Sequence, residues 1–154
     1  MPSARVALIG MGTVGTGTVR LLTEHADRIA RRAGRSVELR RVVVRDARKP
    51  RALNLPAGVL TDDVQSVISD DQVDIAVELM GGVEPARKIV LDLLDAGKDV
   101  VTANKALLCA HGDEIFDRAR QRGRTVAFEA AVAGGIPIIA SITQSMTANQ
   151  IVSI

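Results

Sequence analysis

Short apolar runs alternate along this chain with longer segments in which apolar residues recur every three or four positions. The runs are rich in Val, Ile, Leu and Ala, as buried parallel strands are, and they lie at 5–9, 37–44, 73–79, 99–102 and 125–129. The longer segments predict helices at 16–33, 85–96, within 105–122 and at 138–142. Strands that alternate with helices form right-handed crossovers, so the pattern predicts an α/β fold with a doubly wound parallel sheet.

Turn-forming residues support these boundaries. Pro85 stands near the start of one predicted helix and Gly97 follows its end, which is the usual asymmetry of these two residue types. After the second predicted strand, a loop with two prolines leads to the sequence Thr-Asp-Asp at 61–63. The side chains of this sequence are expected to cap a short helix that runs through Ser69.

The composition is that of an ordinary globular chain. With 154 residues, 47% of them hydrophobic and 25% charged, the chain has the length and apolar content of one domain. A single cysteine, Cys109, excludes an internal disulfide, and it follows two leucines, where a small apolar residue is expected to pack. The apolar run near the N-terminus is too short for a signal or membrane-spanning segment, so we expect a cytoplasmic protein with no membrane partner.

Positive charge is unevenly distributed. The formal net charge is only +2, yet ten basic residues fall between Arg28 and Arg51. Such a stretch is most often a solvated helix face and strand end, but it also suits a phosphate group or a nucleic acid. Single-stranded nucleic-acid sites offer aromatic side chains for stacking, and this stretch has none, so we expect no nucleic-acid partner.

A glycine motif joins the first predicted strand to the first predicted helix. Its spacing, Gly10-x-Gly12-x-x-Gly15, is the dinucleotide fingerprint when a strand precedes it and a helix follows. Gly10 permits a tight turn, Gly12 lets the backbone approach a pyrophosphate, and Gly15 lets the helix pack closely on the strand. Thr13 and Val14 lie within the motif beside the helix N-terminus, whose free N–H groups attract phosphate, and are expected to contact the cofactor. The motif predicts a Rossmann-type domain that binds NAD or NADP.

The end of the second predicted strand distinguishes these two cofactors. An acidic residue there binds the ribose 2′-hydroxyl of NAD, whereas arginine accommodates the 2′-phosphate of NADP. Arg45 falls at this position, with Arg48, Lys49 and Arg51 close behind, which favours NADP. If the strand is one residue longer, Asp46 takes the ribose and the preference reverses.

Four longer segments carry a more specific signal. They are GMGTVGTG at 10–17, ELMGG at 78–82, AGKDVVTANKALL at 96–108 and EAAVAGGIPII at 129–139. In order and spacing they resemble homoserine dehydrogenases over essentially the whole chain, and TANKALL combined with GGIPII is the most diagnostic pair. The resemblance implies an oxidoreductase that uses NADP by preference, or NAD, and reduces aspartate 4-semialdehyde to homoserine. This reaction belongs to threonine, methionine and isoleucine biosynthesis.

The same resemblance implies site residues. Lys105 corresponds to the active-site lysine of the family, whose ammonium holds the substrate or polarises its carbonyl. Thr102, Asn104 and Lys105 are expected at the nicotinamide, and Met80 and Gly81 complete the cofactor contacts. By position alone Lys105 is also consistent with a surface lysine at a helix start, although a cation gains nothing from that end of a helix.

A second implied site is a loop that coordinates a monovalent cation, usually sodium, largely through main-chain oxygens. The corresponding residues are Glu129, Val132, Gly134 and Ile136. The cation is expected to be structural, because sodium has no redox chemistry. Without the resemblance, these residues are a glycine-rich turn into a helix that begins at Pro137.

The expected organisation is a dinucleotide-binding domain over 1–148, followed by the first residues of a truncated catalytic and dimerisation domain over 149–154. The sequence QIVSI near the end resembles the opening of a strand. We therefore expect a chain that is inactive alone, with a complete enzyme that is a homodimer or homotetramer. A non-catalytic NAD(P)-sensing module and another NAD(P)-dependent oxidoreductase stay open as alternatives.

Overall fold

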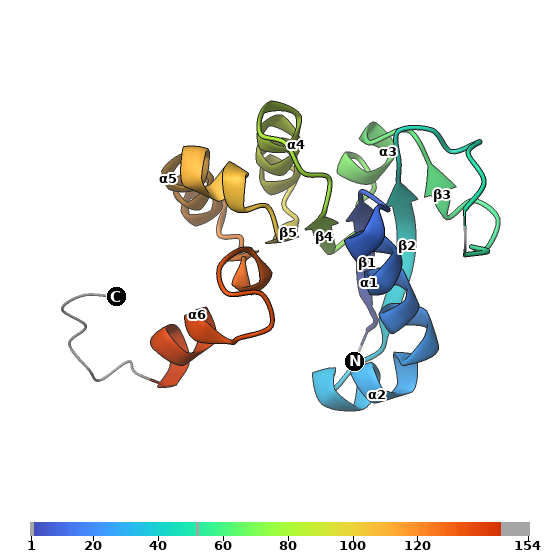
Figure 1. Ribbon diagram of the computed structural model, residues 1–154, viewed down its shortest axis with the longest axis horizontal. Coiled ribbons are helices and arrows are strands. Elements are labelled where there is room, and N and C mark those ends of the chain that lie inside the picture. The colour runs from blue at the N-terminus through green and yellow to red at the C-terminus, as the bar shows by residue number, and fades with distance from the viewer. Residues whose placement is uncertain (1, 52, 146–154) are drawn as a thin grey trace.

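The computed structural model describes residues 2–51 and 53–145, whose strands form one six-stranded parallel sheet (Figure 1). The strands are β1 (Ala4–Ile9), β2 (Val37–Val43), β3 (Leu60–Thr61), β4 (Ile75–Glu78), β5 (Asp99–Thr102) and β6 (Val126–Ala127). Their order in the sheet is β3-β2-β1-β4-β5-β6. The order reverses between β1 and β4, and open α/β sheets bind their ligands beside such a reversal, at the carboxyl ends of the strands.

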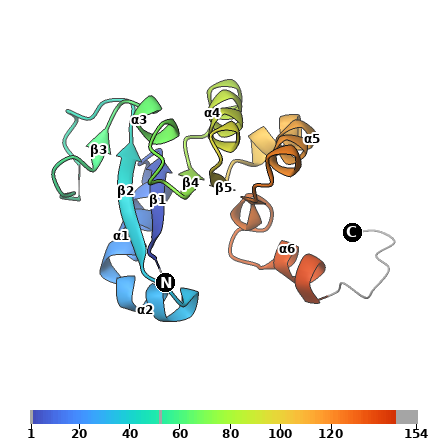
Figure 2. The same ribbon diagram turned by 180° about the vertical axis from the view of Figure 1, so that it is seen from behind.

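Helices cover both faces of this sheet. They are α1 (Thr13–Glu24), α2 (Ala26–Ala33), α3 (Gln65–Ile68), α4 (Glu84–Asp95), α5 (Lys105–Arg122) and α6 (Ile138–Ala140), with a 3-10 turn at Glu129–Ala131 and a π turn at Ser141–Ser145. Helix α1 lies in front of β1 and β2 in Figure 1 and behind them in Figure 2. The α/β, doubly wound parallel sheet expected from the sequence is confirmed.

The two faces form two separate apolar clusters. Ala7 and Ile9 of β1 pack with residues of α3, α4 and α5, whereas Leu8 packs on the opposite face with Val19 of α1. Successive side chains of a strand point to opposite faces, so a strand buried on both sides is continuously apolar. This is why the run Ala4–Ile9 contains one charged residue, Arg5, close to its start.

The first predicted helix is wrong in one respect, because it is two helices. Residue His25, with φ −119° and ψ 24°, interrupts the helical backbone between α1 and α2. Before the break, the Thr23 hydroxyl donates to the main-chain oxygen of Val19 at 2.9 Å. Such bonding of a side chain back to the preceding turn bends helices. Gly34, with φ 71°, ends α2 directly after residue 33, the predicted end of the helical segment.

Two further differences concern short strands. The proline-containing loop includes β3, which pairs with Val42 and Val43 of β2. Two residues are too few to show the sequence pattern of a strand, so β3 was not predicted. The predicted strand at 125–129 ends at Ala127, and Glu129 begins the 3-10 turn. Residues 149–154, expected to open a second domain, lie outside the described residues.

Polar side chains form contacts at the amino ends of the strands, which lie opposite the glycine motif. The Arg5 guanidinium donates to the Asp74 carboxylate at 2.9 Å and holds the pKa of Asp74 below its usual range. Lys98 is 2% exposed, and burial lowers the pKa of its ammonium group, which donates to the main-chain oxygens of Asp70 at 2.6 Å and Val73 at 3.2 Å. These contacts join the segments that enter β1, β4 and β5.

Among the helices that the structure describes, none combines the length and the apolar character needed to cross a membrane.

Candidate functional site

The glycine motif forms the turn between β1 and α1 and allows two close approaches. Gly10 has φ +101°, a left-handed conformation that side chains disfavour, and a Cβ atom there would lie 2.7 Å from the main-chain oxygen of Leu79. A Cβ atom on Gly15 would overlap the main-chain oxygen of Gly10. The first and third glycines therefore serve the packing of α1 against the ends of β1 and β4, as their spacing predicts.

The second glycine faces open space. No atom outside its chain neighbours lies within 4 Å of a Cβ atom built on Gly12, which is the N-cap of α1. No side chain caps this helix start, and its first turn contains no acidic residue. The N–H groups of the first turn, which includes Thr13 and Val14, are thus free for an anion. The turn fits the pyrophosphate of a dinucleotide, both in space and in charge.

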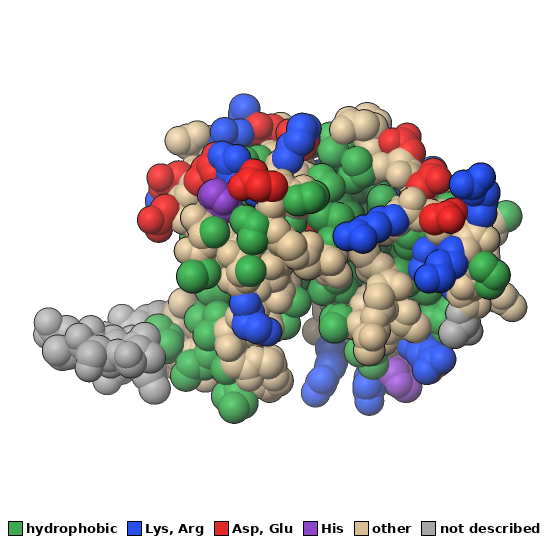
Figure 3. Space-filling view, turned by 45° about the horizontal axis from the view of Figure 1, so that its top comes forward, with side chains coloured by type: hydrophobic (Ala, Val, Ile, Leu, Met, Phe, Trp, Pro, Cys, Tyr) green, Lys and Arg blue, Asp and Glu red, His purple; other side chains and the backbone are tan. Residues whose placement is uncertain are grey.

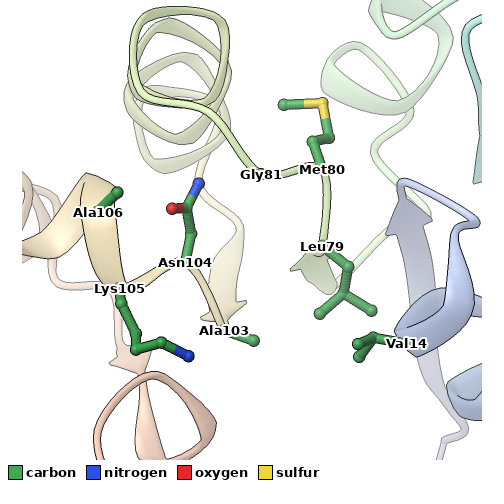
Figure 4. Close-up of a pocket in the computed structure, with 8 residues that line it drawn as sticks. All are labelled: Val14, Leu79, Met80, Gly81, Ala103, Asn104, Lys105 and Ala106. Atoms are coloured by element: carbon green, nitrogen blue, oxygen red, sulfur yellow. The ribbon is translucent and has the colours of Figure 1, made fainter.

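A pocket of about 410 Å³ opens beside this turn, at the carboxyl ends of β4 and β5 (Figure 4). Its lining comes from α1, from the segment after β4 and from the start of α5: Val14, Leu79, Met80, Gly81, Ala103, Asn104, Lys105 and Ala106. Five of the site residues predicted from the sequence, Val14, Met80, Gly81, Asn104 and Lys105, therefore line one pocket. The strand order reverses beside it, where ligands of α/β sheets bind.

Lys105 is the first residue of α5 and is exposed. Asn104 is the N-cap of this helix: its side-chain oxygen accepts from the Leu107 N–H at 3.1 Å, and its side-chain nitrogen donates to the main-chain oxygen of Gly82 at 2.7 Å. In Figure 4 the Asn104 amide points toward the Gly81 segment, whereas the Lys105 side chain leaves α5 in another direction, below Ala103. Lys105 thus lines the pocket with an exposed side chain that takes no part in the cap.

Thr102 is in a different position from the one its assignment as a cofactor contact suggests. It is 1% exposed and is not part of the pocket lining. Its hydroxyl donates to the Glu78 carboxylate at 2.7 Å and accepts from the Asn104 N–H at 3.0 Å. Glu78 itself is fully buried, and the sequence analysis missed it as a site residue. The available signal was an acidic residue at the end of an otherwise apolar strand.

Arg45 lies outside the pocket, two residues beyond β2, and is exposed. The alternative residue, Asp46, is engaged locally: its carboxylate accepts from the Arg48 N–H at 2.9 Å, and its main-chain oxygen accepts from Arg51 at 3.0 Å. The bond from the Arg48 N–H holds one oxygen of the Asp46 carboxylate in its own turn. Arg45 is therefore the freer of the two to meet a group bound at the carboxyl end of β2.

The basic stretch from Arg28 to Arg51 is divided in space. Helix α2 lies at one end of β2, and the loop that contains Arg45 follows the other end (Figure 1). On the upper part of the face that Figure 3 presents, basic side chains are interspersed with acidic ones, whereas at its lower edge basic side chains gather beside a histidine without acidic neighbours. This arrangement agrees with the interpretation of a solvated helix face and a separate strand end.

The loop predicted to hold a cation places its carboxylate elsewhere. Both oxygens of Glu129 accept main-chain N–H bonds at the start of α6, from Ile139 at 2.8 Å and Ala140 at 2.9 Å. Among the residues that the structure describes, no hydrogen bond reaches the main-chain oxygens of Val132 and Gly134. The main-chain oxygen of Ile136 accepts from the Ile138 N–H at 2.8 Å, so two carbonyls of the implied set are free, while Ile136 and Glu129 are engaged within the loop and helix.

His, Cys, Asp and Glu side chains are the other possible ligands for a metal ion in the described residues. Within residues 2–51 and 53–145, no three His, Cys, Asp or Glu side chains are grouped closely enough to hold a metal ion. His111 lies at a kink in α5, 3.3 Å from the Glu84 carboxylate.

Cys109 is exposed, so the expectation that it packs as an apolar residue is wrong. It lies on the solvent side of α5, while Leu107 takes the buried position.

Comparisons with known proteins place this geometry in one family. The model of the homoserine dehydrogenase NAD-binding domain matches residues 10–129. The homoserine dehydrogenase of Pseudomonas aeruginosa is 46% identical over 152 residues, which cover 98% of this chain and 34% of that protein. The chain therefore spans about a third of the length of such relatives.

Solved structures agree. The homoserine dehydrogenase of Thiobacillus denitrificans has a TM-score of 0.88 and 48% identity, with 96% of this chain and 34% of that chain covered. A hyperthermophilic archaeal homoserine dehydrogenase in complex with NADPH has a TM-score of 0.74 at 22% identity, covering 92% of this chain and 48% of that one. The second likeness shows a shared fold.

Proposed function

Because this chain belongs to the homoserine dehydrogenase family, we propose that it is the cofactor-binding part of an enzyme that reduces L-aspartate 4-semialdehyde to L-homoserine with NADPH. One observation supports this most. An open glycine turn, an uncapped helix start and Lys105 lie together at the carboxyl ends of the strands. The archaeal homoserine dehydrogenase of the same fold was solved in complex with NADPH.

In this proposal, two regions of the chain contact different parts of the cofactor. The N–H groups at the start of α1 hold the pyrophosphate, with Gly12 giving the backbone room to approach. Met80, Gly81 and Asn104 then lie at the nicotinamide end, on the pocket side of β4 and β5. The bound cofactor supplies the hydride for the reduction.

Lys105 has the chemistry to act on the substrate carbonyl. As a hydride reaches the carbonyl carbon, negative charge develops on the oxygen, and an ammonium that donates a hydrogen bond to this oxygen stabilises the transition state. The same group can supply the proton that completes the alcohol. Because substrate must also be fixed in a reactive geometry, we propose that residues outside this chain complete the substrate site, so that the chain alone binds cofactor without turnover.

The chain is expected to bind NADPH more tightly than NADH because Arg45 is free to contact the 2′-phosphate. Arg45→Ala should weaken NADPH binding roughly ten- to a hundredfold, which is the range for loss of a charge-assisted hydrogen bond, and change NADH binding little. Titration of each dinucleotide, followed by cofactor fluorescence, measures both effects.

The matched control is Arg31→Ala, which removes an exposed arginine from α2 at the other end of β2. It lowers the net charge by the same amount, so it reports any effect of the overall field. Equal losses in the two variants would assign the preference to general charge. A parent chain that prefers NADH would move the role to Asp46, and one that binds neither dinucleotide would refute the proposed function.

We further propose that the loop from Glu129 to Ile136 binds sodium through the free main-chain oxygens of Val132 and Gly134. Any ligand bound only by the folded state raises stability by mass action, about 1.4 kcal/mol at ten times its dissociation constant. Replacing sodium with tetramethylammonium at constant ionic strength should then lower the melting temperature of this chain by roughly 3–6 °C. A melting temperature that does not depend on the cation would leave the loop as a turn.

A further inference from the structure

A closed set of hydrogen bonds lies behind the candidate pocket, and a buried carboxylate is at its centre. Glu78, the last residue of β4, is 0% exposed. One of its carboxylate oxygens accepts from the Met80 N–H at 2.8 Å, and the other accepts from the Thr102 hydroxyl at 2.7 Å. A single side chain therefore contacts both the segment that leaves β4 and the end of β5.

The set closes through Asn104. The Thr102 hydroxyl accepts from the Asn104 N–H at 3.0 Å, and the Asn104 side chain donates to the main-chain oxygen of Gly82 at 2.7 Å. Gly82 follows Met80 by two residues, so the path returns to the segment from which it began. We call these five residues, Glu78, Met80, Gly82, Thr102 and Asn104, the Glu78 ring. In Figure 4 the Asn104 side chain extends from the start of α5 toward this segment.

Burial of the Glu78 carboxylate costs folding free energy, and its position between the two pocket segments accounts for this cost. Burying a carboxylate is expensive unless donors satisfy it, and within the described residues no Lys, Arg or His side chain forms an ion pair with Glu78. A Val or Ile side chain at the end of β4 satisfies the fold at lower cost, since the rest of this strand is apolar. The carboxylate stands instead where the two pocket segments meet.

We propose that Glu78 is a positioning residue, which holds the Met80–Gly81 segment and the Asn104–Lys105 segment in register across the pocket. This inference rests on the proposed function, in which the pocket receives the nicotinamide end of the cofactor. Lys105 follows Asn104 directly, and the Asn104 cap fixes where α5 begins. Loss of the carboxylate therefore displaces the ammonium and the opposite wall of the pocket relative to each other. Glu78 contacts that wall through the Met80 N–H and acts on Lys105 only through Thr102 and Asn104.

Glu78→Gln tests the proposal at nearly constant side-chain volume. Amide hydrogen exchange of the cofactor-free chain should become roughly tenfold faster or more at Met80 and, across the ring, at Asn104 and Leu107. NADPH affinity should fall by a similar factor. The matched control is Lys98→Met, which removes the other strongly buried charge from the opposite edge of the sheet. It should lower thermal stability but leave exchange at these three amides and NADPH affinity close to those of the parent chain.

A second pair of variants separates hydrogen bonding from packing. Thr102→Ser keeps the hydroxyl and loses a methyl group, whereas Thr102→Val keeps the volume and loses the hydroxyl. The Glu78 ring predicts slower exchange at Asn104 and tighter NADPH binding for Ser than for Val, while a purely packing role predicts the reverse order.

The reverse order, or faster exchange at Met80 alone after Glu78→Gln, would overturn the proposal. In a chain that binds neither dinucleotide the proposed function fails, and the exchange rates still decide whether Glu78 connects the two segments.

Discussion

In a full-length homoserine dehydrogenase that contains this chain, Lys105→Ala should lower kcat by roughly two to three orders of magnitude, the usual loss when one donor to a developing oxyanion is removed. NADPH affinity should change much less, because the ammonium acts on the carbonyl oxygen mainly in the transition state. Lys105 lines the pocket, and its side chain is exposed. The measurement is NADPH oxidation with aspartate 4-semialdehyde, together with NADPH titration of both proteins.

Two further variants make this result specific. Lys105→Arg should not restore turnover, since a planar guanidinium places its donors differently from a compact ammonium. Lys88→Ala, which removes an exposed lysine of α4 that pairs with Asp92, should leave kcat close to the parent value. Near-normal turnover of Lys105→Ala would return Lys105 to the role of a surface lysine at a helix start.

Much of the fold was predictable because its central strand, β1, is buried on both faces and its neighbours are buried in part. Such strands are continuous apolar runs, and they alternate with helical periods, so the parallel α/β sheet follows from the sequence. The glycine turn was predictable for a different reason. Gly10 and Gly15 are required by close backbone contacts, while Gly12 leaves the space beside the helix start open, and the three glycines stand at the fixed spacing of the motif.

The remaining features depend on contacts that no local sequence pattern predicts. Strand β3 is two residues long, and the break at His25 divides a segment whose apolar period continues across it. Glu78 and Thr102 are 24 positions apart and meet only because β4 and β5 are neighbours in the sheet. Glu129 was assigned to a cation, whereas its carboxylate binds amides ten and eleven residues further along. Long-range polar contacts are therefore what the sequence alone left open.

Two glycines of α1 should respond in opposite ways to the same substitution. Gly15→Ala places a methyl group against the main-chain oxygen of Gly10, so the helix must shift away from the turn. Forced overpacking of this kind costs roughly 1–3 kcal/mol. Gly17→Ala, in the same helix but with nothing within 4 Å of the new methyl group, should stabilise the chain by about 1 kcal/mol, because alanine favours helix more than glycine does.

Thermal unfolding and NADPH titration of the two variants measure these effects, with Gly17→Ala as the matched control. One kcal/mol corresponds to a shift of about 2–4 °C in the melting temperature of a chain of this size. Gly15→Ala should also weaken NADPH binding about tenfold or more, since the shift moves the first N–H groups of α1 away from the Gly10 turn, and 1.4 kcal/mol already corresponds to a factor of ten. A Gly15→Ala chain that is destabilised yet binds NADPH as tightly as the parent would separate this turn from the cofactor. The pyrophosphate would then have to bind elsewhere than at the start of α1.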